Sequence, residues 1–522
     1  MYNLNEQQKQ AVERTGSPLL IIAGAGTGKT TVITQKIGWL VEQGLAKADE
    51  ILALTFTEKA AGEMAERADM LLPYGYFDLW IMTFHSFAEK ILQQHGLDIG
   101  LPTNFKILNE FQQWALVKKN LDKFDLDYYR PLGNPTKFIS ALLQHFSRAK
   151  DEDIHPAQYL EYAADLKQNL DTMLSGGGKR KNIKAQMSNV KSISNIQYPI
   201  SNFIDADGEF DKVIAEQEVL RINEVANAYH VYQQVLLDNS ALDFGDLINY
   251  TLRLFRERPL ILAKFQKQFK YVLVDEFQDT NWAQYELIKL LTGCQDVSAK
   301  NGANLTVVGD DDQSIFRFRG ASMSNILQFK RDYPQAQEIV LTQNYRSTQN
   351  ILNTAYEFIK LNNPNRLEYQ LNQDGEERDA NKKVDKRLQA QAKDAGVIEV
   401  IQGKNLPDEV NKVIAKIAEL KIKDKEASWN DFAILVRANA SAKEFTSALE
   451  IAGLPHVFLA SRGLYSRPVI MDLIAYLNLL DNYHESTAMY RVLNIPVFKF
   501  SHEEIISFLN LARKKAWSLY ET

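Results

Sequence analysis

The sequence predicts an α/β protein built around a doubly wound parallel sheet, and three observations lead to this prediction. Residues 23–30, AGAGTGKT, match the phosphate-loop pattern G-x-x-x-x-G-K-[ST] with alanine at its first position, between an apolar run and a helical pattern. A long region, residues 101–240, carries amphipathic helical periodicity without strand signals and is expected to be a helical insertion. Four further apolar runs, each followed by polar residues, are typical of buried parallel strands: residues 51–56, 80–83, 271–274 and 306–308.

The phosphate-loop pattern predicts a nucleotide site. Its glycines allow several backbone N–H groups to point at phosphate oxygens, and the helix that follows adds the positive end of its dipole. In that geometry Lys29 reaches the β- and γ-phosphates of ATP, and the Thr30 hydroxyl coordinates Mg²⁺. The alternative is a glycine-rich strand-to-helix turn without a ligand. The candidate nucleotide-binding residues of this stretch are Ala23, Gly24, Ala25, Gly26, Thr27, Gly28, Lys29, Thr30 and Thr31.

Catalytic candidates follow two later strands. Asp275 and Glu276 end the run 271–274, and alternating side-chain directions let Asp275 bind the metal while Glu276 faces the attacking water as general base. Gln313, after the run 306–308, is placed to bind the γ-phosphate or its water. These residues predict hydrolysis of a nucleotide rather than binding alone.

Three more residues are candidates around the nucleotide. Arg346 could be an arginine finger, which stabilises the charge that develops during phosphoryl transfer. Tyr345 beside it could stack on adenine. Gln8 offers both a donor and an acceptor to an adenine edge, although a surface glutamine is the plainer interpretation.

Candidate DNA contacts lie where strands give way to helices. Phe56, Thr57 and His85 stand at the edge where open α/β sheets bind ligands, so that rings can stack on bases and helix N-termini can hold phosphates. Phe318 and Arg319 add a ring for a base and a charge for a phosphate. Ordinary core packing is the alternative for each aromatic residue.

Composition limits the other possibilities. The net charge of −6 provides no global attraction for nucleic acid, so any polyanion site must be local. The single cysteine, Cys294, excludes an internal disulfide framework, and no apolar run is long enough to cross a membrane. We therefore expect a cytoplasmic protein. Residues 172–204 hold five basic and no acidic residues and are expected to form a mobile linker, or alternatively a loop that follows a phosphate backbone.

Seven motifs occur in one order along residues 4–348: LNEQQ, AGAGTGKT, LTFTEKAA, TFHSF, VDEFQD, VVGDDDQSIFRFRGA and LTQNYRS. Together they resemble the UvrD, Rep and PcrA group of superfamily 1 DNA helicases, with further similarity to about residue 480. The resemblance implies two RecA-like domains with ATP and Mg²⁺ between them, each interrupted by a helical subdomain. It also implies 3′-to-5′ movement on single-stranded DNA, action at junctions with duplex DNA, and repair or replication proteins as partners.

Carried over residue by residue, the resemblance supports the roles given above. Gln8 matches the adenine-reading glutamine, Gln313 the γ-phosphate contact and Arg346 the arginine finger. The DNA-contacting motifs contain Phe56, Thr57, His85, Phe318 and Arg319. The expected domains are a first RecA-like domain at residues 1–100 and 241–335, a helical insertion at 101–240, an incomplete second RecA-like domain at 336–460, and the start of a second helical subdomain at 461–522.

The sequence also departs from the group. Thr31 stands where many members have an arginine that packs on adenine, and Phe318 replaces a tryptophan. No segment resembles the last two helicase motifs, so we expect an N-terminal part that binds ATP, hydrolyses it poorly and does not unwind duplex. The alternatives are the helicase part of a helicase–nuclease, and a single-strand-binding protein that retains ATP binding without motor function.

Overall fold

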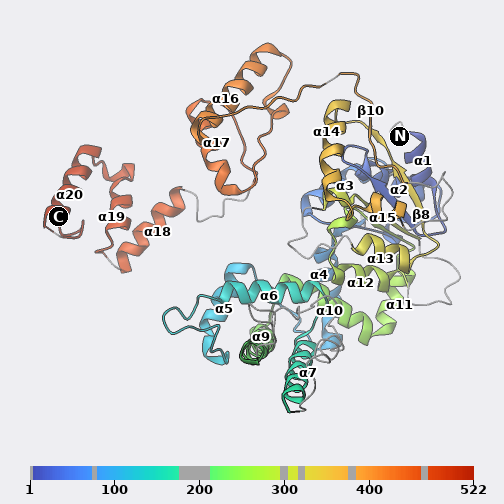
Figure 1. The fold of residues 1–522 in the computed structure, drawn as a ribbon, viewed down its shortest axis with the longest axis horizontal. Helices are drawn as coiled ribbons and strands as arrows, with labels where there is room; N and C mark the ends of the chain where they lie inside the picture. Colours follow the sequence, from blue (N-terminus) through green and yellow to red (C-terminus); the bar gives the residue numbers. More distant parts are fainter. Residues whose placement is uncertain are drawn as a thin grey trace. The chain divides into compact units, whose positions relative to one another are not determined.

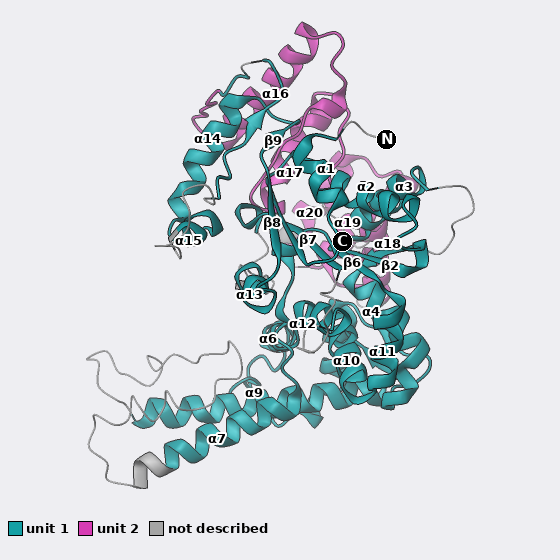
Figure 2. Cartoon of the chain, turned by 90° about the vertical axis from the view of Figure 1, so that its right-hand side faces the viewer, with its two compact units in different colours: residues 1–398 teal, residues 399–522 magenta. Residues whose placement is uncertain are grey.

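The computed structural model describes ten stretches of the chain: residues 4–72, 79–175, 212–293, 304–314, 324–373, 384–394, 396–459, 468–481, 483–515 and 517–522. The chain divides into two compact units, residues 1–398 and 399–522 (Figure 2). Three of the features singled out above, Phe318, Arg319 and Cys294, lie outside the described residues. Most of the 172–204 stretch lies outside them as well.

The first unit is organised around a six-stranded sheet in the order β3-β2-β6-β7-β1-β8, and every neighbouring pair is parallel. The prediction of an α/β fold with a parallel sheet is therefore confirmed. The carboxyl ends of all six strands lie at one edge, where an open α/β sheet binds its ligands. The strands are β1 (Leu19–Ala23), β2 (Ile51–Thr55), β3 (Trp80–Thr83), β6 (Tyr271–Val274), β7 (Asn304–Gly309) and β8 (Gln337–Leu341).

Strand β8 follows the predicted end of the first domain at residue 335 and belongs to the same sheet. It pairs with β1 from Leu19 opposite Gln337 to Ala23 opposite Leu341. Strand β8 thereby covers the edge of β1 that β7 leaves free. The segment after β8 therefore starts beside the end of β1, where the phosphate-loop pattern begins.

The inner strands β1, β2, β6 and β7 are buried on both faces of the sheet, to which successive side chains point alternately. Leu20 and Ile22 join the core under α4, α10 and α12, while Leu19 and Ile21 join the core under α1, α2 and α3. The strands consequently read as continuous apolar runs. The helices of this layer are α1 (Glu6–Glu13), α2 (Lys29–Glu42), α3 (Glu58–Asp69), α4 (Phe84–His95), α10 (Phe244–Glu257), α11 (Pro259–Gln268), α12 (Trp282–Leu291) and α13 (Ser324–Asp332).

The predicted helical insertion is present (Figure 1). It has a core of its own, built on buried tyrosine, phenylalanine and aliphatic side chains. Helices α7 and α9 run side by side (Figure 2). A short parallel pair, β4 (Lys106–Ile107) with β5 (Ala241–Leu242), joins the two ends of the insertion. Its helices are α5 (Glu110–Lys119), α6 (Ile139–Asp151), α7 (Pro156–Ser175) and α9 (Lys212–Asp238).

The last part of the first unit follows β8. Strand β9 (Gln343–Asn344) pairs in parallel with β10 (Gln389–Ala390), and α14 (Gln349–Ile359) and α15 (Leu367–Gln373) lie between them in sequence. The pairing returns the chain to residues 343–344 after an excursion of more than forty residues. Two separate segments are thereby held next to the end of β1.

The second unit is helical in its described residues. Helices α16 (Leu406–Lys423) and α17 (Asn439–Ile451) share one small core. No strand occurs among the described residues from 399 to 459, and the division into a second RecA-like domain and a second helical subdomain stays a prediction. Helices α18 (Pro468–Asp481), α19 (Ser486–Leu493) and α20 (His502–Lys515) follow.

Short 3₁₀ helices connect several of these elements: Ala48–Glu50, Gly96–Ile99, Leu121–Lys123, Phe277–Asp279, Asp311–Gln313, Lys360–Asn362, Trp429–Asp431 and Pro496–Phe498. Among the helices that the structure describes, none combines the length and the apolar character needed to cross a membrane.

A buried polar cluster joins the insertion to the sheet layer. Lys150, on α6, lies 2.6 Å from the Asp243 carboxylate and 2.8 Å from that of Asp246, and the Tyr232 hydroxyl donates to Asp243 at 2.9 Å. The ammonium and the two carboxylates stabilise each other in a site from which water is excluded. The cluster therefore ties α6, α9 and the start of α10 together.

Asp151, next to Lys150, lies at the same junction. The Asn281 amide donates to its Oδ1 at 2.7 Å. Burial raises the pKa of Asp151 to about 7, although this hydrogen bond acts in the opposite direction, and the charges of Glu152 and Asp243 raise it further. An ionised Asp151 is thus unfavourable in the folded unit.

We predict that Asp151→Asn flattens the pH dependence of stability. Because the folded pKa of about 7 lies above the usual 3.8, the folded state binds the proton more tightly. The stability gained is complete below about pH 4 and is lost as the pH rises through about 7. Asparagine avoids the buried charge, so the thermal unfolding midpoint of the variant should exceed that of the parent at about pH 8.5 and differ less at about pH 5.5. An equal change at both pH values would contradict this.

Candidate active site

The phosphate-loop residues form a tight turn between β1 and α2. Gly26 and Gly28 have φ angles of 75° and 87°, in the left-handed region that favours glycine. The Thr27 hydroxyl donates to the Gly24 carbonyl at 2.8 Å and holds the turn closed. Lys29 is the first residue of α2, so its side chain leaves the helix N-terminus where backbone N–H groups have no helical partner. The local fold predicted from the glycine pattern is present.

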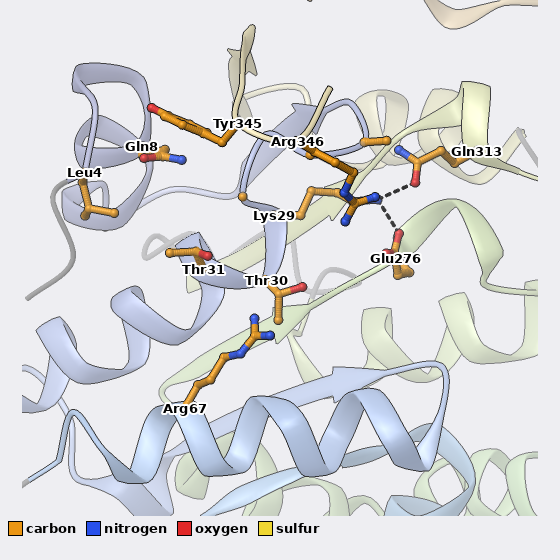
Figure 3. A pocket seen from close by; sticks show the side chains of 13 residues that line it. Leu4, Gln8, Lys29, Thr30, Thr31, Arg67, Glu276, Gln313, Tyr345 and Arg346 are labelled. Carbon is orange, nitrogen blue, oxygen red and sulfur yellow. Dashed lines mark hydrogen bonds and ion pairs between the residues drawn. The ribbon is translucent and has the colours of Figure 1, made fainter. Parts of the chain in front are cut away.

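Lys29 is the centre of the site. Its Nζ donates to Glu276 Oε2 at 2.6 Å and to Gln313 Oε1 at 3.1 Å, and Figure 3 shows all three side chains converging. The three residues lie in the segments that follow β1, β6 and β7. They meet because these strands are parallel neighbours whose carboxyl ends share one edge.

Thr30 and Asp275 form a second pair beside it. The Thr30 hydroxyl lies 3.2 Å from Asp275 Oδ2. Burial and the neighbouring charge of Glu276 raise the pKa of Asp275 to about 6, against the opposing effect of Lys29. A hydroxyl and a buried carboxylate at this distance are oxygen donors of the kind that hard divalent cations prefer.

Glu276 is held from two sides. In addition to Lys29, the Gln278 amide donates to its Oε2 at 2.7 Å. The Glu276 backbone has a φ of 50°, an uncommon conformation for a residue with a side chain. The strand therefore turns sharply at Glu276, and its carboxylate faces the phosphate loop.

Gln8 contacts the loop directly and is not a surface side chain. Its Oε1 accepts from the Asn5 backbone N–H at 3.1 Å, and its Nε2 donates to the Thr27 carbonyl at 2.9 Å. The same Asn5 caps α1 and donates through its side chain to the Tyr345 hydroxyl at 2.8 Å. Gln8 and Tyr345 are thereby placed on the same side of the pocket (Figure 3).

Residues 343–346 lie against the phosphate loop. The Tyr345 N–H donates to the Gly26 carbonyl at 2.9 Å, and the Asn344 amide donates to the Ala25 carbonyl. Asn344 also accepts from the Arg346 N–H at 2.9 Å, which fixes the backbone where the Arg346 side chain leaves. Arg346, which lies 320 positions after Gly26 in the sequence, is in this way brought to the same pocket.

The pocket has a volume of about 480 Å³ and gathers most of the predicted nucleotide-site residues. Ala23, Gly24, Thr27 and Asp275 lie outside its lining. Leu4 and Arg67 also line the pocket, although the sequence did not single them out as site residues. Arg67 reaches from α3 toward Thr30 and Thr31 (Figure 3). The only sequence signal for this tertiary contact was that α3 follows a predicted strand. The lining is Leu4, Gln8, Ala25, Gly26, Gly28, Lys29, Thr30, Thr31, Arg67, Glu276, Gln313, Tyr345 and Arg346.

The described DNA candidates lie at the ends of β2 and β3, not in this pocket. Thr57 caps α3 by accepting from the Ala60 N–H at 3.1 Å, and Phe56 precedes it. His85, at the start of α4, packs its ring edge against Phe244, and burial lowers its pKa. The N-termini of α3 and α4 thus open at one edge of the sheet.

Comparison with known proteins gives a consistent family assignment. The family model for the UvrD/REP helicase N-terminal domain matches residues 4–334, and the model for the UvrD-like helicase C-terminal domain matches residues 339–521. Relatives named ATP-dependent DNA helicase PcrA include that of Bacillus subtilis, 36% identical over 509 residues, which are 97% of this chain and 57% of the relative. The Leuconostoc citreum protein is 34% identical over 496 residues, which are 94% of this chain and 54% of the relative. The Staphylococcus aureus protein is 32% identical over 521 residues, which are 99% of this chain and 59% of the relative.

These matches correct one expectation. The interpretation of the chain as only the N-terminal part of such a protein is not borne out, because the match to the C-terminal domain model extends across residues 339–521. The chain spans between 54% and 59% of the length of the relatives described above.

We predict that Gly26→Ala separates the two sides of the pocket. A Cβ at Gly26 would lie 2.7 Å from the Arg346 Cβ and 2.8 Å from the Asn344 amide nitrogen, and the φ of 75° adds about 1–2 kcal/mol of strain. Affinity for a fluorescent ATP analogue should fall by about tenfold or more. Gly62→Ala is the matched control, since a Cβ there meets nothing within 4 Å and the residue lies inside α3. Equal affinities of the two variants would contradict the prediction.

Proposed function

The chain belongs to the UvrD/REP helicase family, and from this premise we propose that it is an ATP-dependent DNA helicase. It hydrolyses ATP with Mg²⁺, moves 3′ to 5′ along single-stranded DNA and unwinds duplex at junctions, in repair, replication restart or recombination. The observation that carries the proposal is the convergence of Lys29, Glu276, Gln313 and Arg346 on one pocket. The name of the relatives, ATP-dependent DNA helicase, agrees with it.

The donor set fits ATP with a divalent cation. Thr30 and Asp275 supply the two oxygens that would hold Mg²⁺, and the ion when bound would neutralise phosphate charge. The N-terminus of α2 and the Lys29 ammonium supply positive charge for the phosphates. The aromatic face of Tyr345, half exposed, and the amide of Gln8 suit the base.

Glu276 is the proposed general base. In the structure its carboxylate accepts from Lys29, and phosphate oxygens would compete for the same ammonium. Gln278 still holds the Glu276 carboxylate in place at 2.7 Å. Glu276 then takes the proton of the attacking water, while Gln313 orients that water or the γ-phosphate.

Arg346 is the proposed arginine finger. It leaves the backbone beside Gly26 and Asn344, so its position depends on the packing of residues 343–346 against the phosphate loop. A guanidinium placed there stabilises the negative charge that develops on the transferred phosphoryl group. Movement of this segment relative to the loop would link nucleotide state to the rest of the chain.

The proposed DNA path crosses the N-termini of α3 and α4. Thr57 and the start of α4 provide backbone and hydroxyl donors for phosphates, and Phe56 and His85 provide rings for bases. Phe318 and Arg319 are proposed to extend this path. Pocket and path lie at the same edge of the sheet, a placement that supports coupling between hydrolysis and DNA grip.

The test of the function is ATP hydrolysis with and without single-stranded DNA. The parent should hydrolyse ATP faster with DNA, and Glu276→Gln should lower the rate by ~10²-fold or more while keeping nucleotide affinity, because the amide keeps the shape and loses the base. Lys29→Ala should instead weaken nucleotide binding. A parent whose rate does not respond to DNA, or a Glu276→Gln variant with the parental rate, would exclude the proposed mechanism.

Phe318→Ala and Arg319→Ala should weaken single-strand affinity. Loss of the ring should cost about 1–3 kcal/mol, and loss of the arginine should act mainly through the salt-dependent part of binding. Titration of a labelled oligonucleotide at two salt concentrations measures both effects. Nucleotide affinity without DNA is the control and should stay at the parental value; unchanged DNA affinity in both variants would remove these residues from the path.

A further inference from the structure

Three successive aspartates follow β7 and lie next to the proposed catalytic residues. We call residues 310–313, which contain Asp310, Asp311, Asp312 and Gln313, the aspartate turn. Asp310 and Asp311 are almost fully buried. Buried carboxylates without a cation are strongly unfavourable, so this turn needs a positive partner to exist in its observed conformation.

Lys386 is that partner. Its Nζ lies 2.7 Å from Asp310 Oδ1 and 2.8 Å from Asp312 Oδ2, and it also donates to Asp311 Oδ1. Only 5% of the side chain is exposed. Burial acts to lower the pKa of Lys386, but the three carboxylates outweigh it and raise the pKa above its usual range.

Arg366 binds the other side of the turn. Its Nε and Nη2 donate to the two carboxylate oxygens of Asp312, each at 2.8 Å, in the bidentate arrangement that fixes both groups. The Leu367 N–H, at the start of α15, donates to Asp311 Oδ2 at 2.8 Å. The turn is therefore held by a segment more than fifty residues further along the chain.

The aspartate turn also holds two residues of the catalytic site, Gln313 and Gln278. Asp310 Oδ2 accepts from the Gln313 amide at 2.7 Å, and the other end of this amide accepts from Lys29 at 3.1 Å. The Asp310 N–H donates to Gln278 Oε1 at 3.0 Å, and the Gln278 amide donates to Glu276 at 2.7 Å. In each glutamine, one atom of the side-chain amide bonds to Asp310 and the other bonds to Lys29 or Glu276. Asp310 therefore fixes whether the amide oxygen or the amide nitrogen faces the site.

The segment that carries Lys386 also touches the phosphate loop. Leu388 lies so close to Gly24 that a Cβ there would be 2.8 Å from the Leu388 Cδ1. The next two residues, Gln389 and Ala390, form β10 and pair with β9, which immediately precedes Tyr345 and Arg346. The segment thus contacts the phosphate loop, the aspartate turn and the strand that leads to the proposed arginine finger.

We propose that Lys386 is a positioning residue for ATP hydrolysis, which acts through Asp310 to orient Gln313 toward Lys29 and Gln278 toward Glu276. The proposal rests on the proposed function. Loss of the ammonium leaves three carboxylates in one buried place, and their repulsion moves Asp310 away from both glutamines. Nucleotide binding changes little, because Lys29 and the loop backbone remain.

Lys386→Met tests this, since it keeps the length of the side chain and removes the charge. We expect kcat for ATP to fall by about tenfold or more, as misplacement of catalytic groups does, with the affinity for an ATP analogue within about threefold of the parent. Lys386→Arg restores a cation and should recover most of kcat. The matched control is Lys289→Met, a largely buried lysine 2.8 Å from Glu286 and 3.6 Å from Asp332, which should leave both constants at the parental value.

The outcomes separate the two proposals. Parental kcat in a folded Lys386→Met variant, or equal losses in affinity and kcat, overturns the positioning role while leaving the proposed function intact. If the parent protein does not hydrolyse ATP, both the positioning role and the proposed function are overturned. If Lys386→Met does not fold by circular dichroism, Asp310→Asn decides, because it keeps the shape of the side chain and removes the charge that pairs with Lys386 and accepts from Gln313. A severalfold fall in kcat supports the role, and a parental kcat overturns it.

Discussion

The contact of the Lys29 ammonium with Glu276 and Gln313 is the interaction on which the rest of the site depends. It joins the segments that follow three strands whose order in the sheet is β6-β7-β1, and each segment supplies one of the three side chains. A parallel arrangement is required, because only then do strands distant in sequence end at one edge. The helices on the two faces, with separate cores, hold these strands in register and leave that edge to the polar residues.

Buried charge is handled in the same way at two places in the first unit. Lys150 forms ion pairs with Asp243 and Asp246 where the helical insertion meets the sheet layer, and Lys386 forms ion pairs with the carboxylates of the aspartate turn beside the pocket. Each ammonium comes from a segment far in sequence from its carboxylates. Such clusters add little net stability compared with apolar packing, but removing one partner is costly, so they fix which segments lie together. In this protein they fix the insertion to the sheet and residues 384–388 to the catalytic edge.

The pocket is assembled from two kinds of backbone contact. One is local: the glycines at positions 26 and 28 adopt left-handed conformations that bring N–H groups to the helix start. The other is long-range: Asn344 and Tyr345 bond to carbonyls of the phosphate loop. Asn344 and Arg346 leave no space for a side chain at Gly26. Glycine is therefore required at position 26 for two reasons: its positive φ angle and the lack of space for a Cβ. The long-range contact also makes the position of Arg346 depend on the conformation of the phosphate loop.

The sequence by itself determined the features that depend on near neighbours. Continuous apolar runs indicated strands buried on both faces, the phosphate-loop pattern indicated a turn between β1 and α2, and adjacent acids after a strand placed Asp275 and Glu276 at its end. Helical periodicity in residues 101–240 indicated the insertion. These predictions succeed because strand burial, turn conformation and helix amphipathicity are set by residues a few positions apart.

Only the tertiary structure decided which of these segments meet. Strand β8 pairs with β1, Arg67 reaches the pocket from α3, and Lys386 and Arg366 form ion pairs with the aspartate turn. These are contacts between residues tens to hundreds of positions apart. A lysine in a charged stretch has no local pattern that distinguishes a solvated side chain from one buried among three carboxylates. The distinction depends on the desolvation and pairing of charges, which exist only when the chain has brought both partners into one place.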